Sequence, residues 1–134
     1  MMRLCIDTNI YSAFKRGSSD VISLLEEADE VFIPVVVLGE LYAGFFQGMN
    51  QKRNLVELNE FLNTPGIDII EINNSIAERY GNIVKTLRQQ GTPIPTNDIW
   101  IASAAIEKNA RLLSYDKHFE RVPGSMLVPI SPNG

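Results

Sequence analysis

The chain has 134 residues, with twelve Lys and Arg against sixteen Asp and Glu, and a formal net charge of −4 at pH 7. A hydrophobic fraction of 45% and a charged fraction of 21% are typical of a globular protein and exclude a disordered or fibrous chain. The length suits one hydrophobic core, so a single domain over residues 1–134 is expected. The negative charge by itself argues against a nucleic-acid partner, although grouped Lys and Arg residues leave room for a local positive rim.

No stretch is apolar enough to cross a membrane. The longest candidate, residues 31–46, is interrupted by Pro34 and Glu40, whereas a bilayer requires roughly 20 apolar residues. The N-terminal segment lacks the apolar core of a signal peptide, so a cytoplasmic protein is expected. The single cysteine, Cys5, cannot form an internal disulfide and is expected to be a small core residue of a buried strand.

The first half of the chain predicts two strands and a helical hairpin. Residues 3–6 form a short apolar run that ends at Asp7, and residues 31–33 form another that Pro34 limits. From Val35 the apolar residues follow a helical period up to Gly48, at Leu38, Leu41, Tyr42 and Phe45. A second helix follows directly, and its apolar side consists of Leu55, Leu58, Phe61 and Leu62.

The second half predicts three further strands and two helices. Residues 67–72 read as a strand, and Ser75 with Glu78 has the spacing of a capping box at the start of a long helix that Gly91 ends. The next helix begins near Thr96 and Asn97 and is apolar around most of its circumference, so central burial is expected. Residues 111–115 and 126–128 predict the last two strands, the second of them at an edge.

This alternation predicts an α/β fold, a three-layer α/β/α sandwich with a mainly parallel central sheet. Ligands bind to such sheets beyond the carboxyl ends of the strands. Asp7 and Asp116 each follow a predicted strand, and Asp98 lies in the first turn of the buried helix. Glu40 borders the apolar face of another helix. We therefore expect the carboxylates to share one edge of the sheet.

Each carboxylate also has a purely structural interpretation. An acid in the first turn of a helix interacts favourably with the helix dipole by about 0.3–1 kcal/mol, which would explain Asp98 alone. Asp7 and Asp116 fit local turns, and Glu40 fits a solvated helix position. Their joint occurrence at strand ends and helix starts is harder to explain by independent structural roles.

Converging carboxylates would require a cation. Two of them about 4 Å apart repel by roughly 4 kcal/mol at an effective dielectric constant near 20. Oxygen-only ligation with no His or Cys nearby favours Mg²⁺, or Mn²⁺ as its substitute, over zinc. Such an ion activates water and stabilises charge on a phosphodiester, so the residues predict a hydrolytic nuclease.

The sequence resembles PIN-domain ribonucleases, and within them the VapC-type toxins of type II toxin–antitoxin systems. The matching motifs cover almost the whole chain: CIDTN at 5–9, VVLGELYAG at 36–44, IAERYG at 76–81, PIPTNDIWIAS at 93–103, and LLSYDKHF at 112–119 followed by VPG at 122–124. No single motif is specific, and the resemblance rests on their order and spacing.

This resemblance implies an acidic catalytic set made of Asp7, Glu40, Asp98 and Asp116. Among them, the metal ligands would be Asp7, Asp98 and Asp116. Thr8 and Asn9 would support Asp7, and Ser114 stands where similar toxins often have Thr. The implied function is a Mg²⁺-dependent endoribonuclease that cleaves RNA.

The resemblance also implies a homodimer and a cognate antitoxin, whose C-terminal segment would lie in a groove near the first helices. The candidate lining residues are Tyr42, Phe45, Phe46 and Met49. Ordinary core packing between the paired helices is the alternative explanation for each of them. Trp100 is expected in the core or in a dimer interface, and His118 is expected to be structural, without a catalytic role.

Two other functions are compatible with parts of the sequence. A haloacid-dehalogenase-like phosphatase also begins with a strand that ends in a nucleophilic Asp, but such enzymes usually have a second Asp where this chain has Asn9. A non-catalytic binding module would have carboxylates that merely face solvent. It predicts that Asp98→Asn leaves the phenotype and the metal affinity unchanged.

Overall fold

The computed structural model describes residues 1–132. Five strands form one sheet in the order β3-β2-β1-β4-β5, and all neighbouring strands run parallel. The strands are β1 Arg3–Ile6, β2 Glu30–Pro34, β3 Ile67–Ile70, β4 Arg111–Leu113 and β5 Leu127–Val128. The helices are α1 Thr8–Lys15, α2 Ser19–Glu27, α3 Val35–Gln47, α4 Gln51–Leu62, α5 Asn74–Gln90, α6 Thr96–Glu107 and the 3₁₀ helix η1 Lys117–Arg121.

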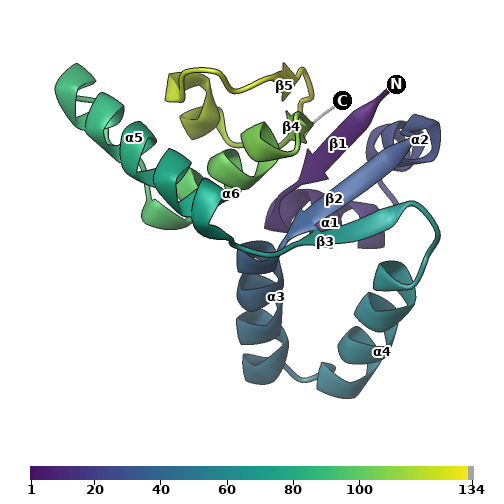
Figure 1. The fold of residues 1–134 in the computed structure, drawn as a ribbon. Coiled ribbons are helices and arrows are strands. Elements are labelled where there is room, and N and C mark those ends of the chain that lie inside the picture. The colour runs from purple at the N-terminus through teal and green to yellow at the C-terminus, as the bar shows by residue number, and fades with distance from the viewer. Residues whose placement is uncertain (133–134) are drawn as a thin grey trace.

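Helices cover both faces of the sheet (Figure 1). The connections β1 to β2 and β2 to β3 step in one direction across the sheet, whereas the connection from β3 to β4 crosses back. Because parallel crossovers are right-handed, α1 to α4 lie on one face and α5 with α6 on the other. The predicted three-layer α/β/α sandwich is confirmed, and its sheet is wholly rather than mainly parallel.

The core forms where the central strands meet α6. Strand β1 is buried from Leu4 to Ile6, so Cys5 is the small core residue predicted from the sequence. Burial raises the pKa of its thiol, which makes the thiol unreactive. As expected, α6 is buried around most of its circumference, at Ile99, Ile101, Ala102, Ser103, Ala104 and Ala105. Trp100 joins α6 to α5 by stacking on Tyr80, with ring centroids 3.8 Å apart.

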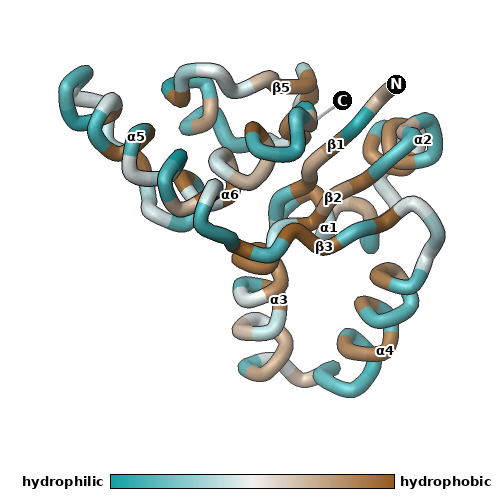
Figure 2. Tube along the Cα trace, viewed as in Figure 1, coloured by the Kyte–Doolittle hydropathy of each residue, from teal (hydrophilic) through white to brown (hydrophobic). Residues whose placement is uncertain are grey.

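The outer helices are amphipathic. Figure 2 shows α4 and α5 alternating between hydrophobic and hydrophilic residues, as helices with one solvent face do. The predicted hairpin is present, since α3 packs against α4, and it projects from the sheet in Figure 1. Within residues 1–132, no helix combines the length and the apolar character that a bilayer crossing needs.

Some predicted boundaries are wrong. Asn73, not Ser75, caps α5, because its Oδ1 accepts a hydrogen bond from the backbone N–H of Ile76 at 2.9 Å. Asn and Ser are comparable N-caps, so the spacing of a capping box could not choose between them. The strands expected over 67–72 and 111–115 end at Ile70 and Leu113, where their neighbours β2 and β1 give way to helices and pairing stops.

Candidate active site

Two neighbouring strands end side by side at the site. β1 and β4 are in register at Ile6 and Leu113, so the next residues, Asp7 and Ser114, emerge next to each other. The strand order changes direction here, since β2 and β3 lie beyond β1 whereas β5 lies beyond β4. Open parallel sheets bind ligands at such a switch point.

Asp7 is a nearly buried carboxylate, with 5% of its surface exposed. Its Oδ1 caps α1 by accepting from the backbone N–H of Ile10 at 3.0 Å, and its Oδ2 accepts from the Ser114 hydroxyl. Burial raises the pKa of Asp7 from 3.8 to about 6, the negative charges of Asp116 and Asp98 add to the rise, and the two hydrogen bonds oppose it. Carboxyl groups with raised pKa values cluster at functional sites.

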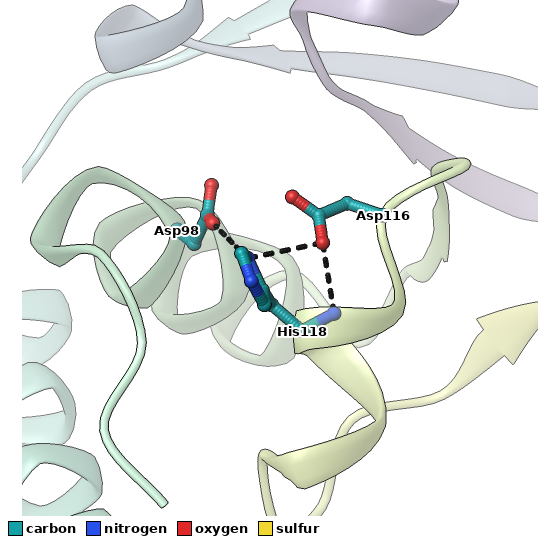
Figure 3. A group of neighbouring side chains, drawn as sticks. All are labelled: Asp98, Asp116 and His118. Carbon is teal, nitrogen blue, oxygen red and sulfur yellow. Dashed lines mark hydrogen bonds and ion pairs between the residues drawn. The ribbon is translucent and has the colours of Figure 1, made fainter.

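Two more carboxylates flank a histidine (Figure 3). Asp98 lies in the first turn of α6, and Asp116 caps η1 by accepting from the backbone N–H of His118 at 2.8 Å. The His118 Nδ1 atom lies 3.2 Å from Asp98 Oδ2 and 3.0 Å from Asp116 Oδ1. Burial raises the pKa of Asp98, the charges of Asp116 and Glu40 act in the same direction, and His118 lowers it.

Glu40 reaches the same edge from the middle of α3. Its Oε1 accepts a hydrogen bond from the Thr8 hydroxyl at 2.6 Å, and its Oε2 accepts from the Asn97 side-chain amide at 3.4 Å. Thr8 begins α1, whereas Asn97 precedes Asp98 in α6. Glu40 therefore connects the helices of the two faces.

The structure thus brings the predicted carboxylates together. Ser114 links Asp7 to Asp116, because its hydroxyl donates to Asp7 and its oxygen accepts from the backbone N–H of Asp116 at 2.9 Å. Asp98 interacts electrostatically with Asp116 and with Glu40. One ligand atom from each of Asp98, Asp116 and His118 lies within 4.8 Å of the other two. This concentration of negative charge favours a bound cation.

The chain matches known proteins along most of its length. The sequence model described as "PIN domain" matches residues 4–125. The chain belongs to the PIN-domain family. Ribonuclease VapC2 of Rickettsia felis is 33% identical over 127 residues, which cover 91% of this chain and 93% of that protein. Ribonuclease VapC1 of Haemophilus influenzae strain R2866 is 30% identical over 122 residues, which cover 87% of this chain and 90% of that protein.

A solved structure extends the similarity to three dimensions. The crystal structure of VapBC2 from Rickettsia felis, bound to a DNA fragment from their promoter, contains a chain similar to this PIN domain. The TM-score is 0.85 and the identity 30%, with 95% of this chain and 98% of that chain covered. The relatives identify this PIN domain as a member of the VapC group.

The supporting residues of this PIN domain differ in part from the prediction. Ser114 contacts Asp7 directly, whereas Thr8, expected to support Asp7, donates its hydroxyl hydrogen to Glu40. The reason is that Thr8 already belongs to α1, which turns its side chain towards α3. Asn9 is exposed on α1.

Two residues at the site were not predicted from the sequence. The expectation that no histidine lies near the carboxylates is wrong, since His118 contacts both Asp98 and Asp116. The order Asp-Lys-His could have indicated the contact between His118 and Asp116. An Asp often accepts a hydrogen bond from the backbone N–H two positions later, which holds the later residue beside the Asp carboxylate. The sequence pattern assigns Asn97 to a helix start and gives no sign of its hydrogen bond to Glu40.

The residues expected to line an antitoxin groove differ in their surroundings. Among the described residues, a groove of about 380 Å³ between α1, α3 and α4 is lined by Phe45 with Tyr11 and Leu41, and not by the other three candidates. Tyr42 and Phe46 instead stack on each other, with ring centroids 5.9 Å apart. Phe46 is 58% exposed and Met49 is fully exposed, so neither is a core residue.

Proposed function

We propose that this PIN domain is an endoribonuclease that depends on a divalent metal ion, Mg²⁺ or Mn²⁺ in its place, and acts as the toxin of a toxin–antitoxin pair. The observation that carries the proposal is the convergence of carboxylates at the switch point of the sheet, with raised pKa values at Asp7 and Asp98. The names of the relatives, ribonucleases VapC1 and VapC2, support RNA as the substrate.

The donor set fits a divalent cation. Ligand atoms of Asp98 and Asp116 lie within 4.8 Å of each other, and Asp7 is held next to Asp116 through Ser114. The raised pKa values mean that full ionisation of the cluster is unfavourable without an opposite charge. Asp7, Asp98 and Asp116 would hold the ion, which lowers the pKa of a coordinated water and offsets the charge of the scissile phosphate when bound.

The protein's own hydrogen bonds prepare Glu40 for a separate role. Each of its carboxylate oxygens accepts one bond, from Thr8 and from Asn97, so the side chain is held in one orientation. Each oxygen keeps a further lone pair. Glu40 therefore orients the attacking water and accepts its proton, a function that requires a positioned carboxylate within hydrogen-bond reach.

The two other functions receive less support. In the phosphatase alternative the second acid would stand at position 9, which is an exposed Asn on α1. In the binding-module alternative the carboxylates would merely face solvent, whereas only 5% of the Asp7 surface is exposed. A nuclease explains both the covered carboxylate and the family relationship.

We also propose that an antitoxin protein covers this chain, that the toxin forms a homodimer, and that it acts in the cytoplasm. The VapBC2 complex from Rickettsia felis supports the antitoxin partner. The exposed apolar side chains of Phe46 and Met49 offer contact area on the hairpin of α3 and α4.

Induction in a bacterial host tests the nuclease proposal. Wild-type protein should arrest growth and produce new RNA 5′ ends, whereas Asp7→Asn and Asp98→Asn should do neither. Asp68→Asn is the matched control, because Asp68 is an exposed carboxylate on β3 outside the cluster. Equal growth arrest by the wild type and by Asp98→Asn would contradict the proposal.

A further inference from the structure

We propose that His118 is itself a metal ligand, so that the ion occupies a mixed nitrogen and oxygen site and Mn²⁺ binds more tightly than Mg²⁺. The inference rests on the proposed metal-dependent function and specifies the donor set of that site. It goes beyond an all-carboxylate site by adding one imidazole nitrogen.

The distances around His118 match those between neighbouring ligands of one ion. Octahedral bonds of about 2.1 Å place adjacent ligand atoms about 3.0 Å apart. The Nδ1 atom of His118 lies 3.2 Å from Asp98 Oδ2 and 3.0 Å from Asp116 Oδ1. An ion bound between the three side chains can therefore take Nδ1 and one oxygen of each carboxylate as ligands, since these atoms lie within 4.8 Å of one another.

The position of His118 is fixed by its backbone and by its neighbour in η1. Its backbone N–H is held by Asp116 at 2.8 Å, and the next residue, Phe119, is 1% exposed and anchors η1 in the core. On the opposite side, Asp98 belongs to the buried helix α6. Two independently anchored elements thus aim an imidazole and two carboxylates at one point (Figure 3).

A nitrogen ligand changes which metal the site prefers. Mg²⁺ favours oxygen ligands, whereas imidazole raises the affinity for transition metals. With one imidazole beside the carboxylates, we expect the Kd for Mn²⁺ to be lower than that for Mg²⁺ by about tenfold or more. The carboxylates still bind Mg²⁺, so the proposed reaction remains possible with either ion.

The composition of the chain makes a direct spectroscopic test possible. His118 is the single histidine of the protein, so in untagged protein any imidazole ¹⁴N coupling to bound Mn²⁺ comes from this residue. Pulsed EPR of the Mn²⁺ complex should show that coupling. Free Mn²⁺ measured by EPR gives the Kd for Mn²⁺, and competition with Mg²⁺ gives the second Kd.

His118→Asn separates ligation from hydrogen bonding, since the Asn amide can still donate towards Asp98 and Asp116. We expect this variant to keep its denaturation midpoint, lose the ¹⁴N coupling, and bind Mn²⁺ about tenfold more weakly while its affinity for Mg²⁺ stays within about threefold of the wild type. Glu120→Gln, an exposed residue of η1, is the control and should behave as the wild type.

The outcomes are distinguishable. Wild-type protein that binds Mn²⁺ without ¹⁴N coupling, and loses the ion in Asp98→Asn, would overturn the role of His118 and leave the carboxylate site intact. An unchanged Kd for Mn²⁺ in His118→Asn would overturn it as well. Wild-type protein that binds no Mn²⁺ and no Mg²⁺ would overturn both this inference and the metal-dependent function on which it rests.

Discussion

The hydroxyl of Ser114 donates a hydrogen bond to Oδ2 of Asp7, although the two residues lie 107 positions apart in the chain. The bond joins the ends of β1 and β4, and the same hydroxyl oxygen accepts from the backbone N–H of Asp116 at 2.9 Å. Ser114 therefore sets both the orientation of the buried carboxylate and the start of η1, where Asp116 and His118 lie.

Removal of this hydroxyl should cost stability. Ser114→Ala leaves Oδ2 of a buried carboxylate without its donor, so we expect the free energy of unfolding to fall by about 1–3 kcal/mol at neutral pH and the pKa of Asp7 to rise further. Ser114→Thr keeps the hydroxyl and is the control. Urea denaturation of the two variants checks the difference, and equal stability of Ser114→Ala and the wild type would speak against the coupling.

The buried carboxyl of Asp7 should make the metal-free protein sensitive to pH. Its pKa is about 6 in the folded chain against 3.8 as the ordinary value, so the folded state binds a proton more tightly than the unfolded state. The stabilisation is fully present below about pH 4 and is lost as the pH rises through 6.

For a shift of this size, the loss is up to about 3 kcal/mol. Denaturation in EDTA at several pH values should therefore show a stability difference between the wild type and Asp7→Asn that changes between pH 4 and 7 in favour of the variant. A stability difference that stays constant with pH would show that the raised pKa of Asp7 does not cause the pH dependence.

Mg²⁺ should stabilise the wild type. A ligand at one hundred times its Kd adds about 2.7 kcal/mol to the free energy of unfolding if it binds the folded state alone. We expect a higher Tm with Mg²⁺ than with EDTA for the wild type and for Asp68→Asn, and no increase for Asp98→Asn, measured by thermal denaturation. The same increase in Asp98→Asn would show that Mg²⁺ binds elsewhere.

Thr8 should affect catalysis through Glu40. Thr8→Val removes the donor to Glu40 Oε1 while keeping the shape of the side chain, and the bond it breaks is 2.6 Å long. We expect kcat for RNA cleavage to fall by about tenfold, with little change in KM. This is less than the roughly 10²–10⁴-fold that a positioned acid–base group contributes, because Glu40 keeps its hydrogen bond from Asn97. Thr8→Ser should retain the rate of cleavage. Full activity of Thr8→Val would show that Thr8 has no role in the reaction.

Phe46 should matter for the antitoxin and not for folding. Its ring is 58% exposed and stacks on Tyr42, so Phe46→Ser removes apolar contact area without opening the core. We expect the affinity for the antitoxin to fall by about tenfold or more, with RNA cleavage retained, in line with aromatic residues as interface hot spots. Met126→Ser is the control, because Met126 is 42% exposed and directly precedes β5, outside the hairpin of α3 and α4.

Much of the fold follows from local pattern. The apolar runs of β1 and β2, the helical period of α3 and the apolar circumference of α6 are periodic signals, and they located these elements within one or two residues. The ends of β3 and β4 were overestimated because a strand stops where its neighbour stops, at Pro34 and Ile6, and that pairing is not visible in a single segment.

Asp7, Asp98 and Asp116 could be found because each stands at a strand end or a helix start, and a parallel sheet collects such positions on one edge. Their hydrogen-bond partners could not be found in the same way. Whether the Thr8 hydroxyl turns to Asp7 or to Glu40 depends on the packing of α1 against α3, which brings together residues 32 positions apart. The contact of His118 with Asp98 likewise depends on how η1 packs on α6.

The anchoring of the site is uneven. Asp98 is carried by a helix that is buried around most of its circumference, whereas His118 lies in a five-residue 3₁₀ helix that Asp116 caps and that contacts α6. Short 3₁₀ segments open far more easily than core helices. An ion held by ligands from both elements would tie η1 to α6. It would slow amide hydrogen exchange in η1 and leave the exchange rates in α6 unchanged. The rate of amide hydrogen exchange in η1 would then show whether the active site holds an ion.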